Sequence, residues 1–273
     1  APCNGRAHPT AMMGAIGLHK NDSYISKQAA VGNKTRLYVE GMLGEASAMV
    51  RAMSEKEGLV AVARNPVAAC YLKDNGACGA VSMCIGLGMA MADHIQCQLG
   101  FDPLRAECVG DVGKYDSTDR LSAYFAANAA ATFLDGLLLT VGIVGQVDIE
   151  TRGGFDIGEA SIFSIDSEEG QHELVRLTLM NEYLSCDVGG HTLFSFPDLI
   201  TVIDAGTAWP VSSADLREGM EVIVIGTSMD NLILGEGMYD TSLYKPLEEA
   251  TGRVFSPPRK RYNYLNGQKE IDI

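Results

Sequence analysis

The stretch from Val141 to Gly158, VGIVGQVDIETRGGFDIG, indicates the fold of the second half of the chain. Apolar and polar residues alternate from Val141 to Glu150, as in a β-strand that buries one face. The Gly153-Gly154 pair that follows suits a tight turn, because glycine adopts positive φ at no steric cost. We therefore expect a strand that ends in a turn. Phe155 then either packs inward at a barrel corner, or the glycine backbone is approached closely by another group.

Further strand candidates follow this stretch at short intervals, with glycine-containing turns between them. They are Glu159 to Ile165, Glu173 to Cys186, Leu199 to Asp204 and Glu221 to Ile225. Short strands separated by turn signals are typical of an all-β barrel or sandwich.

The first half of the chain has the spacing of helices mixed with short strands. Helices are predicted over Glu45 to Lys56, residues 77–97 and Asp116 to Asp135, and strands over Thr35 to Glu40 and Leu59 to Ala63. Helices in the first half and strands in the second indicate an α+β protein. We expect a mixed helix/strand first half, a boundary between residues 136 and 145, and a β-rich barrel or sandwich domain after it.

Charge and hydropathy exclude several classes of protein. The 273 residues carry a net charge of −14, which does not suit binding to nucleic acid or to an anionic membrane. The run from Leu121 to Gly145 is long enough to span a bilayer, but Asn128, Asp135 and several glycines interrupt it. We interpret it as a buried, alanine-rich helix followed by a strand. With no secretory signal visible, we expect a cytoplasmic protein without membrane contact.

The seven cysteines do not match a metal template. They stand at positions 3, 70, 78, 84, 97, 108 and 186, an odd number without Cys-x-x-Cys spacing. We expect free thiols in a reducing compartment, with most of those from position 70 to 108 buried as small hydrophobic residues. The sequence predicts no metal site and no cofactor motif.

The N-terminal segment gathers reactive side chains within six residues. Cys3, Asn4, Arg6 and His8 could polarise and attack a carbonyl carbon: Arg6 and Asn4 as hydrogen-bond donors, His8 as base and Cys3 as a nucleophile. The alternative is a surface loop with incidental polar residues. A chain that opens in such a loop, without an initiator Met, also predicts that a second chain covers residues 1–20.

Polar residues within the strand-rich half form a second group of candidates. Arg152 precedes the double glycine, Asn181-Glu182 lies in an apolar strand, and Asp198 follows a proline. Side chains at 181 and 183 would share a face opposite 182. Such residues belong either to a buried hydrogen-bond network or to a substrate site.

Ordered motifs in the second half resemble one known family. They are Thr151-Arg152-Gly153-Gly154-Phe155 with Gly158, Met180-Asn181-Glu182-Tyr183-Leu184, Phe196-Pro197-Asp198-Leu199-Ile200, Asp215-Leu216-Arg217-Glu218-Gly219 and Val224-Ile225-Gly226. This order is similar to the C-terminal part of the S-methyl thiohydantoin desulfurase family, which is associated with hydantoinases. The stretch from Asn4 to Pro9 resembles the family's GRAFPE motif, with His8 in place of Phe and Thr10 in place of Glu.

The resemblance implies a fold, an activity and partners. Residues 1–138 would be the remainder of an α/β domain whose glycine-rich N-terminal segment is absent, 139–245 a β-rich domain and 246–273 a tail. The implied activity is hydrolysis of a small cyclic amide or thioamide such as a hydantoin, catalysed by Asn4, Arg6, His8 and Cys3. Arg152, Asn181, Glu182 and Asp198 would bind the substrate. Either a second protein chain or a homo-oligomer completes the unit; alternatively, the chain is a non-catalytic subunit or scaffold of a hydantoinase-like enzyme.

Overall fold

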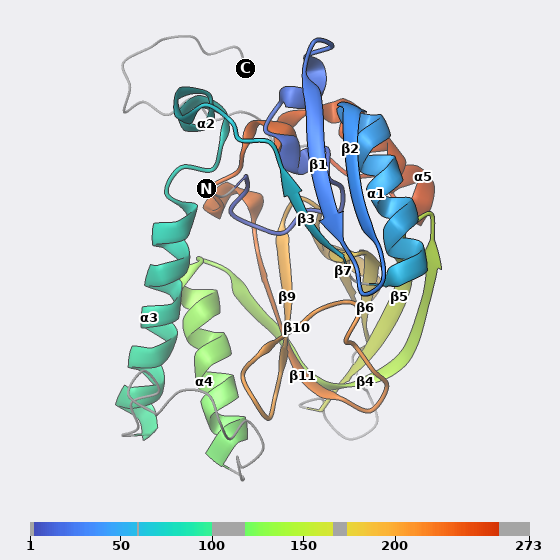
Figure 1. Ribbon diagram of the computed structural model, residues 1–273. Helices are drawn as coiled ribbons and strands as arrows, with labels where there is room; N and C mark the ends of the chain where they lie inside the picture. The colour runs from blue at the N-terminus through green and yellow to red at the C-terminus, as the bar shows by residue number, and fades with distance from the viewer. Residues whose placement is uncertain (1–2, 59, 100–117, 166–173, 257–273) are drawn as a thin grey trace.

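The computed structural model describes residues 3–58, 60–99, 118–165 and 174–256, and these residues form an α+β fold with two sheets (Figure 1). The smaller sheet has the order β2-β1-β3 and is antiparallel. Its strands are β1 (Ile25–Val31), β2 (Arg36–Met42) and β3 (Ala61–Arg64). The helix α1 (Leu43–Glu57) covers this sheet, and Gly58 ends it at φ 76°, as the position of this glycine predicts.

Two longer helices lie side by side and cover part of the larger sheet. They are α3 (Ala80–Leu99) and α4 (Thr118–Phe133), preceded by the short α2 (Ala69–Asn75). Alanines 123, 127 and 130 of α4 pack on Ile223 and Ile225 of the sheet. The predicted alanine-rich buried helix followed by a strand is therefore confirmed, because the next strand begins at Leu137.

The larger sheet has eight strands in the order β10-β9-β11-β4-β5-β6-β7-β8, all antiparallel. They are β4 (Leu137–Arg152), β5 (Phe155–Ser164), β6 (Leu174–Met180), β7 (Glu182–Val188), β8 (His191–Ser195), β9 (Leu199–Asp204), β10 (Pro210–Val211) and β11 (Glu221–Thr227). β9 contacts β7 and β8 although β11, β4, β5 and β6 separate them in this order, so the sheet curls on itself. Ile162, Leu177, Val202 and Val222 fill its concave face.

One strand prediction is wrong in a way that matters for the site. The segment from Glu173 to Cys186 is not one strand but the hairpin β6–β7, which turns at Asn181. Asn181 has φ 57°, a left-handed conformation in which an extended strand cannot continue. Asn181 and Tyr183 therefore do not share one face of a continuous strand.

Short helices connect the remaining segments and pack at one end of the larger sheet. They are the 3-10 turns η1 (Met13–Ala15), η2 (Leu18–Lys20), η3 (Met229–Asn231), η4 (Glu236–Tyr239) and η5 (Thr241–Leu243), and the helix α5 (Lys245–Thr251). A second core joins them: Met13, Phe196, Met238, Tyr244 and Leu247 are all buried in it. This core ties the N-terminal segment to the C-terminal part of the described chain.

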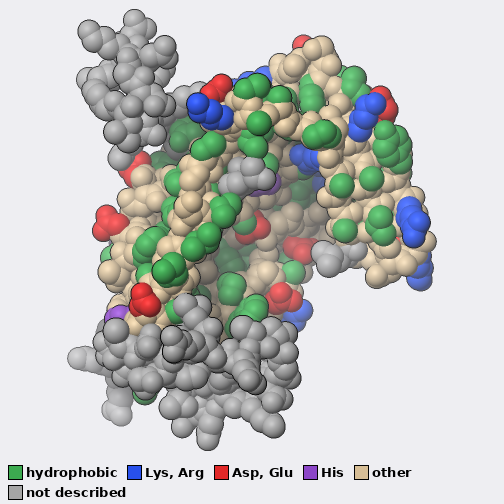
Figure 2. Space-filling view, turned by 60° about the vertical axis from the view of Figure 1, so that its left-hand side comes forward, with side chains coloured by type: hydrophobic (Ala, Val, Ile, Leu, Met, Phe, Trp, Pro, Cys, Tyr) green, Lys and Arg blue, Asp and Glu red, His purple; other side chains and the backbone are tan. Residues whose placement is uncertain are grey.

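The outward face of α3 is apolar and exposed, and one prediction about the cysteines is wrong. Val81, Ile85 and Met89 are each more than half exposed, and Figure 2 shows hydrophobic side chains along this side of the molecule. Cysteines 70, 78 and 84 are exposed rather than buried, whereas Cys186 in β7 is buried and its pKa is raised to about 12 by burial. The side chains of Cys97 and Cys108 lie outside the described residues, and the five described cysteines are free.

Among the described residues, no single helix has both the length and the apolar character needed to cross a bilayer. Only α2 together with residues 80–94 of α3 meets those criteria, as a pair bent by 62°.

Candidate functional site

The N-terminal loop, residues 3–16, packs against segments that lie more than 190 residues away in the sequence. The amide of Gly5 donates to the carbonyl of Ile233 at 2.7 Å, and the amide of Gly235 donates to Asn4 Oδ1 at 2.9 Å. Asn4 Nδ2 donates to the carbonyl of Met13. A Cβ on Gly235 would lie 2.0 Å from the carbonyl oxygen of Cys3, so only glycine permits this close approach.

Arg6 anchors the N-terminal loop in the protein interior. It is 7 % exposed, its Nη1 donates to the carbonyls of Pro197 and Asp198, and its Nε donates to the carbonyl of Ala7. Burial lowers the pKa of Arg6 to about 10, although the nearby Glu182 partly offsets that effect. The guanidinium stays charged at neutral pH and donates to three backbone carbonyls, one in the N-terminal loop and two in the turn between β8 and β9.

Three further predicted residues lie at the junction where the N-terminal loop packs on the β6–β7 turn and on the turn between β8 and β9. Asn181 Nδ2 donates to the carbonyl of Pro9, and Asn181 Oδ1 accepts the amide of Asp156 at 2.9 Å. Asp198 accepts the amides of Ser195 and Met229. Burial raises the pKa of Glu182, and the charge of Arg6 partly lowers it again. Asn4, Arg6, Asn181, Glu182 and Asp198 are thus brought together as the network that fixes the N-terminal loop.

His8 makes one side-chain hydrogen bond in this structure, and this contact occupies only one of its two ring nitrogens. Its Nδ1 lies 2.9 Å from the carbonyl oxygen of Thr10, which can only accept, so Nδ1 carries the proton and Nε2 is the basic nitrogen. The ring lies against Gly14, where a Cβ would approach it to 2.4 Å. Burial lowers the pKa of His8 below 6.5, and the charges of Arg64 and Arg6 lower it further. His8 is therefore a neutral imidazole at neutral pH.

Arg64, at the end of β3, belongs to the same neighbourhood but was missed in the sequence. Its Nη1 donates to the carbonyl of Ala11 at 3.4 Å, and its positive charge lowers the pKa of His8. The residue keeps exposed surface. Burial of part of the guanidinium lowers its pKa, and the nearby Cys3 offsets that effect only in part. Figure 2 shows the surface hollowed between α3 and the part of the chain that holds the small sheet and α1. The only sequence signal for Arg64 is its place before Asn65-Pro66 at a strand end.

A buried histidine–carboxylate pair lies beside this junction and was also missed. His19 Nε2 lies 2.6 Å from Asp240 Oδ2, and Lys20 Nζ lies 3.3 Å from the same oxygen. Burial alone raises the pKa of Asp240, but hydrogen bonds from Ser242 and His19 outweigh it and hold this pKa well below its usual range. The two residues are 221 positions apart in the sequence, so no local motif predicts the pair.

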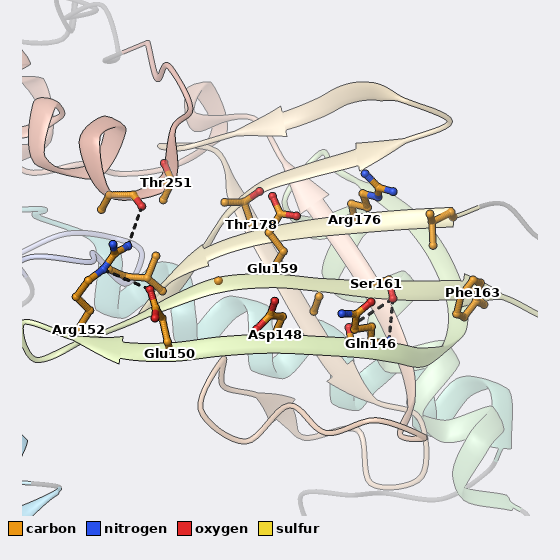
Figure 3. A pocket seen from close by; sticks show the side chains of 15 residues that line it. Gln146, Asp148, Glu150, Arg152, Glu159, Ser161, Phe163, Arg176, Thr178 and Thr251 are labelled. Carbon is orange, nitrogen blue, oxygen red and sulfur yellow. Dashed lines mark hydrogen bonds and ion pairs between the residues drawn. The ribbon is translucent and has the colours of Figure 1, made fainter.

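Arg152 does not belong to the network around Arg6. It stands at the end of β4, donates to the carbonyl of Ala250 and pairs with Glu150 at 3.5 Å. Figure 3 shows it at one end of a groove of about 740 Å³ on the convex face of the large sheet. Arg152 is therefore separated from the network of Arg6, Asn181 and Asp198. Within the described ranges, no three His, Cys, Asp or Glu side chains come together as metal ligands.

Comparison with known proteins gives one match. The family model described as S-Me-THD-like, C-terminal domain, matches residues 45–238. The chain belongs to this family. No curated protein and no solved structure matches the chain.

The boundaries of the S-Me-THD-like domain divide the candidate residues into two sets. Arg64, Arg152, Asn181, Glu182 and Asp198 lie inside the matched range, whereas the N-terminal loop with Asn4, Arg6 and His8 precedes it. The N-terminal loop with His8 thus precedes the matched range and packs on residues that lie inside it.

Proposed function

We propose that the chain hydrolyses a small cyclic amide or thioamide ring of the hydantoin type, with His8 as the general base. The observation that carries this proposal is the state of His8: a neutral imidazole whose Nδ1 proton is held by the carbonyl of Thr10. Because its pKa lies below 6.5, the neutral form of this base predominates at neutral pH. Membership of the S-Me-THD-like family supports this class of substrate, because the family's description refers to thiohydantoin.

The chemical step follows from these positions. His8 Nε2 takes a proton from water as the water oxygen bonds to the ring carbonyl carbon. The carbonyl oxygen becomes an oxyanion, and the guanidinium of Arg64 stabilises it. The ring C–N bond then breaks, and the imidazolium returns its proton to the departing nitrogen. The products are the ring-opened acid and its free amide or thioamide nitrogen.

In this proposal, Asn4 and Arg6 are positioning residues for His8. Both hold the N-terminal loop, through Gly235 and through the carbonyls of Pro197 and Asp198, so that His8 is presented in one orientation. Cys3 lies beside Arg64 and is the alternative nucleophile. Asn181, Glu182 and Asp198 lie where this loop packs, and substrate contacts by these residues belong to the same proposal.

The test is ring opening by the purified chain, followed by chromatography with hydantoin, 2-thiohydantoin and S-methyl thiohydantoin as substrates. His8→Gln should lower kcat/KM at least 100-fold, since general base catalysis contributes about 10² to 10⁴. Cys3→Ser should retain activity if water is the nucleophile. The matched control is His191→Gln, at an exposed position in β8. Equal activity of His8→Gln and the control would refute the proposal.

A non-catalytic role is the second candidate, and the exposed face of α3 favours it. Val81, Ile85 and Met89 present an apolar surface that the described residues of the chain do not cover. Such a surface suits a subunit or scaffold of a larger enzyme, either with another chain or with its own copies. The native mass of the purified protein, alone and with a hydantoinase chain, shows whether a complex forms. Ring opening measured on the same samples separates the two roles: a catalytic chain opens rings by itself, and a scaffold does so only in complex.

A further inference from the structure

The groove on the convex face of the large sheet has no part in the proposed hydrolysis. It is built by three adjacent strands and the helix α5, and its volume is about 740 Å³. Polar side chains from all of these elements line it (Figure 3): Gln146, Asp148, Glu150, Arg152, Glu159, Ser161, Arg176, Thr178 and Thr251. Ile157, Phe163 and Ala250 add apolar wall.

Two carboxylates occupy opposed positions on neighbouring strands at the floor of this groove, and in Figure 3 that of Glu159 is directed toward Thr178. Asp148 of β4 is the direct partner of Glu159 of β5 in the antiparallel register. Side chains in such a pair have Cβ atoms roughly 4.5–5.5 Å apart, and like charges there repel. In the described part of the chain, no ion pair or hydrogen bond neutralises either side chain. Among the described residues, the two carboxylates therefore lie on adjacent strands with no cation paired to either.

Thr178 of β6 extends this pair into a row of three, because it is the register partner of Glu159 on the other side. The residue is 2 % exposed, and its Oγ1 is buried without any hydrogen-bond partner. Figure 3 shows the side chain on the groove side of the sheet, with its hydroxyl directed toward Glu159. A buried hydroxyl without a partner is unusual in a folded protein and indicates a site that a ligand can complete.

The acceptor groups in this row indicate which kind of cation it can bind. A metal ion is a poor match, since no three acidic, His or Cys side chains of the described residues converge as ligands. A primary ammonium has three N–H donors. Asp148, Glu159 and the Thr178 hydroxyl offer three acceptors from three adjacent strands. The geometry suits an alkylammonium group better than a bare ion.

A cation stands two residues further along β6. Arg176 lies on the same face as Thr178, roughly 6.5–7 Å away along the strand. Its side chain makes no ion pair with another described residue. By contrast, Arg152 at the other end is engaged by Glu150 and Ala250. Asp187, the register partner of Arg176, senses the charge of Arg176, but both oxygens of Asp187 already accept hydrogen bonds from Arg253, so Arg176 keeps donors for a further anion.

We propose that this groove binds an ω-amino carboxylate, a small molecule whose primary ammonium and carboxylate are separated by several methylenes. The ammonium lies between Asp148, Glu159 and Thr178, the carboxylate pairs with Arg176, and the methylenes lie along the sheet surface. Such a molecule can reach both ends of the row, whereas in an ordinary α-amino acid ammonium and carboxylate are attached to one carbon.

The test is isothermal titration calorimetry of the full chain with 6-aminohexanoate, hexylamine and hexanoate. Saturable binding of 6-aminohexanoate is expected, tighter than that of either monofunctional compound. Glu159→Gln should weaken 6-aminohexanoate and hexylamine at least 10-fold, and Thr178→Val at least 3-fold. Arg176→Gln should weaken 6-aminohexanoate while leaving hexylamine unchanged.

Glu218→Gln, at an exposed carboxylate outside this groove, is the matched control and should bind like the parent chain. Circular dichroism establishes that each variant is folded. Unsaturable binding, equal binding by Glu159→Gln and the control, or equal weakening of all ligands by Arg176→Gln overturns the proposal. Because His8 is not part of the groove, His8→Gln should bind 6-aminohexanoate normally.

Discussion

The guanidinium of Arg6 lies over the ring of Phe196, with 4.6 Å between its central carbon and the ring centroid. The same side chain donates to the carbonyls of the two residues that follow Phe196. A single buried cation thus combines a cation–π contact with charge-assisted hydrogen bonds. This arrangement joins the N-terminal loop to the turn between β8 and β9.

Loss of Arg6 should destabilise the fold. Arg6→Met removes the donor for two carbonyls and leaves Glu182 without its neighbouring cation. We expect a loss of about 3 kcal/mol in the free energy of unfolding, measured by urea denaturation. Arg36→Met, at an exposed position in β2, is the control and should change stability by less than about 0.5 kcal/mol. Equal losses in the two variants contradict the anchoring role.

Asn181 should be sensitive to the type of replacement. Asn181→Ala removes two side-chain hydrogen bonds and places a Cβ residue of poor left-handed propensity at φ 57°. Asn181→Gly loses the same hydrogen bonds but adopts that φ freely. We expect Asn181→Ala to be less stable than Asn181→Gly by about 1 kcal/mol. Thermal melting of the two variants checks the order, and a more stable alanine variant contradicts it.

The activity proposed for His8 should have a defined acid limb. The folded pKa of His8 lies below 6.5, so the neutral base predominates at neutral pH and is lost as pH falls through that lowered value. We expect kcat/KM for ring opening to be flat above about pH 6.5 and to fall below it. In His8→Gln the residual activity should lack this limb. A limb centred above pH 6.5 would assign it to another group.

Asp240 should contribute to stability at neutral pH and not in acid. Its folded pKa is lower than its usual value of 3.8, so the unfolded chain takes up the proton first as pH falls. The stabilising contribution of Asp240 is present above the unfolded pKa of 3.8 and disappears as pH falls through the folded pKa. Asp240→Asn should therefore lower the urea midpoint at about pH 7 more than at about pH 3. Asp22→Asn, at an exposed carboxylate, should lower neither.

Two glycines should respond oppositely to alanine. A Cβ on Gly158 in β5 would lie 1.9 Å from the carbonyl oxygen of Asp148 and 2.8 Å from Cα of Ile149, so the backbone must move. Gly158→Ala should cost more than about 2 kcal/mol. A Cβ on Gly88 in α3 meets nothing within 4 Å, and Gly88→Ala should stabilise the helix by about 0.5–1 kcal/mol. Chemical denaturation measures both, and a loss at Gly88 contradicts the prediction.

The sequence predicted those parts of the fold that local spacing determines. The helix α1 with Gly58 at its end, the alanine-rich α4, and the strands β4, β9 and β11 follow from periodicity and turn residues. The hairpin at Asn181 was missed because β6 and β7 are both apolar, and a single left-handed residue divides them. β8 has three exposed residues at its start, so no buried alternation marks it.

The candidate site was predictable only in part, for a different reason. Asn4, Arg6 and His8 stood out because they are close in sequence. Arg64 and the His19–Asp240 pair become neighbours of that loop only through tertiary packing. The outer face of α3 has the apolar spacing of a buried helix, and spacing alone cannot tell which of its faces the chain itself covers.

The hydrogen bond between Asn4 and Gly235 spans 231 residues, and this span imposes an order on biosynthesis. At about 5–20 residues per second, a ribosome needs roughly 10–50 s to reach Gly235 after it has made Asn4. During that interval the N-terminal loop has neither Pro197 nor Gly235 to bind, and Met13 lacks the core that later buries it. The imidazole of His8 therefore reaches its final position among the last events of folding. A nascent chain released before η4 leaves that loop unanchored and open to chaperones and proteases.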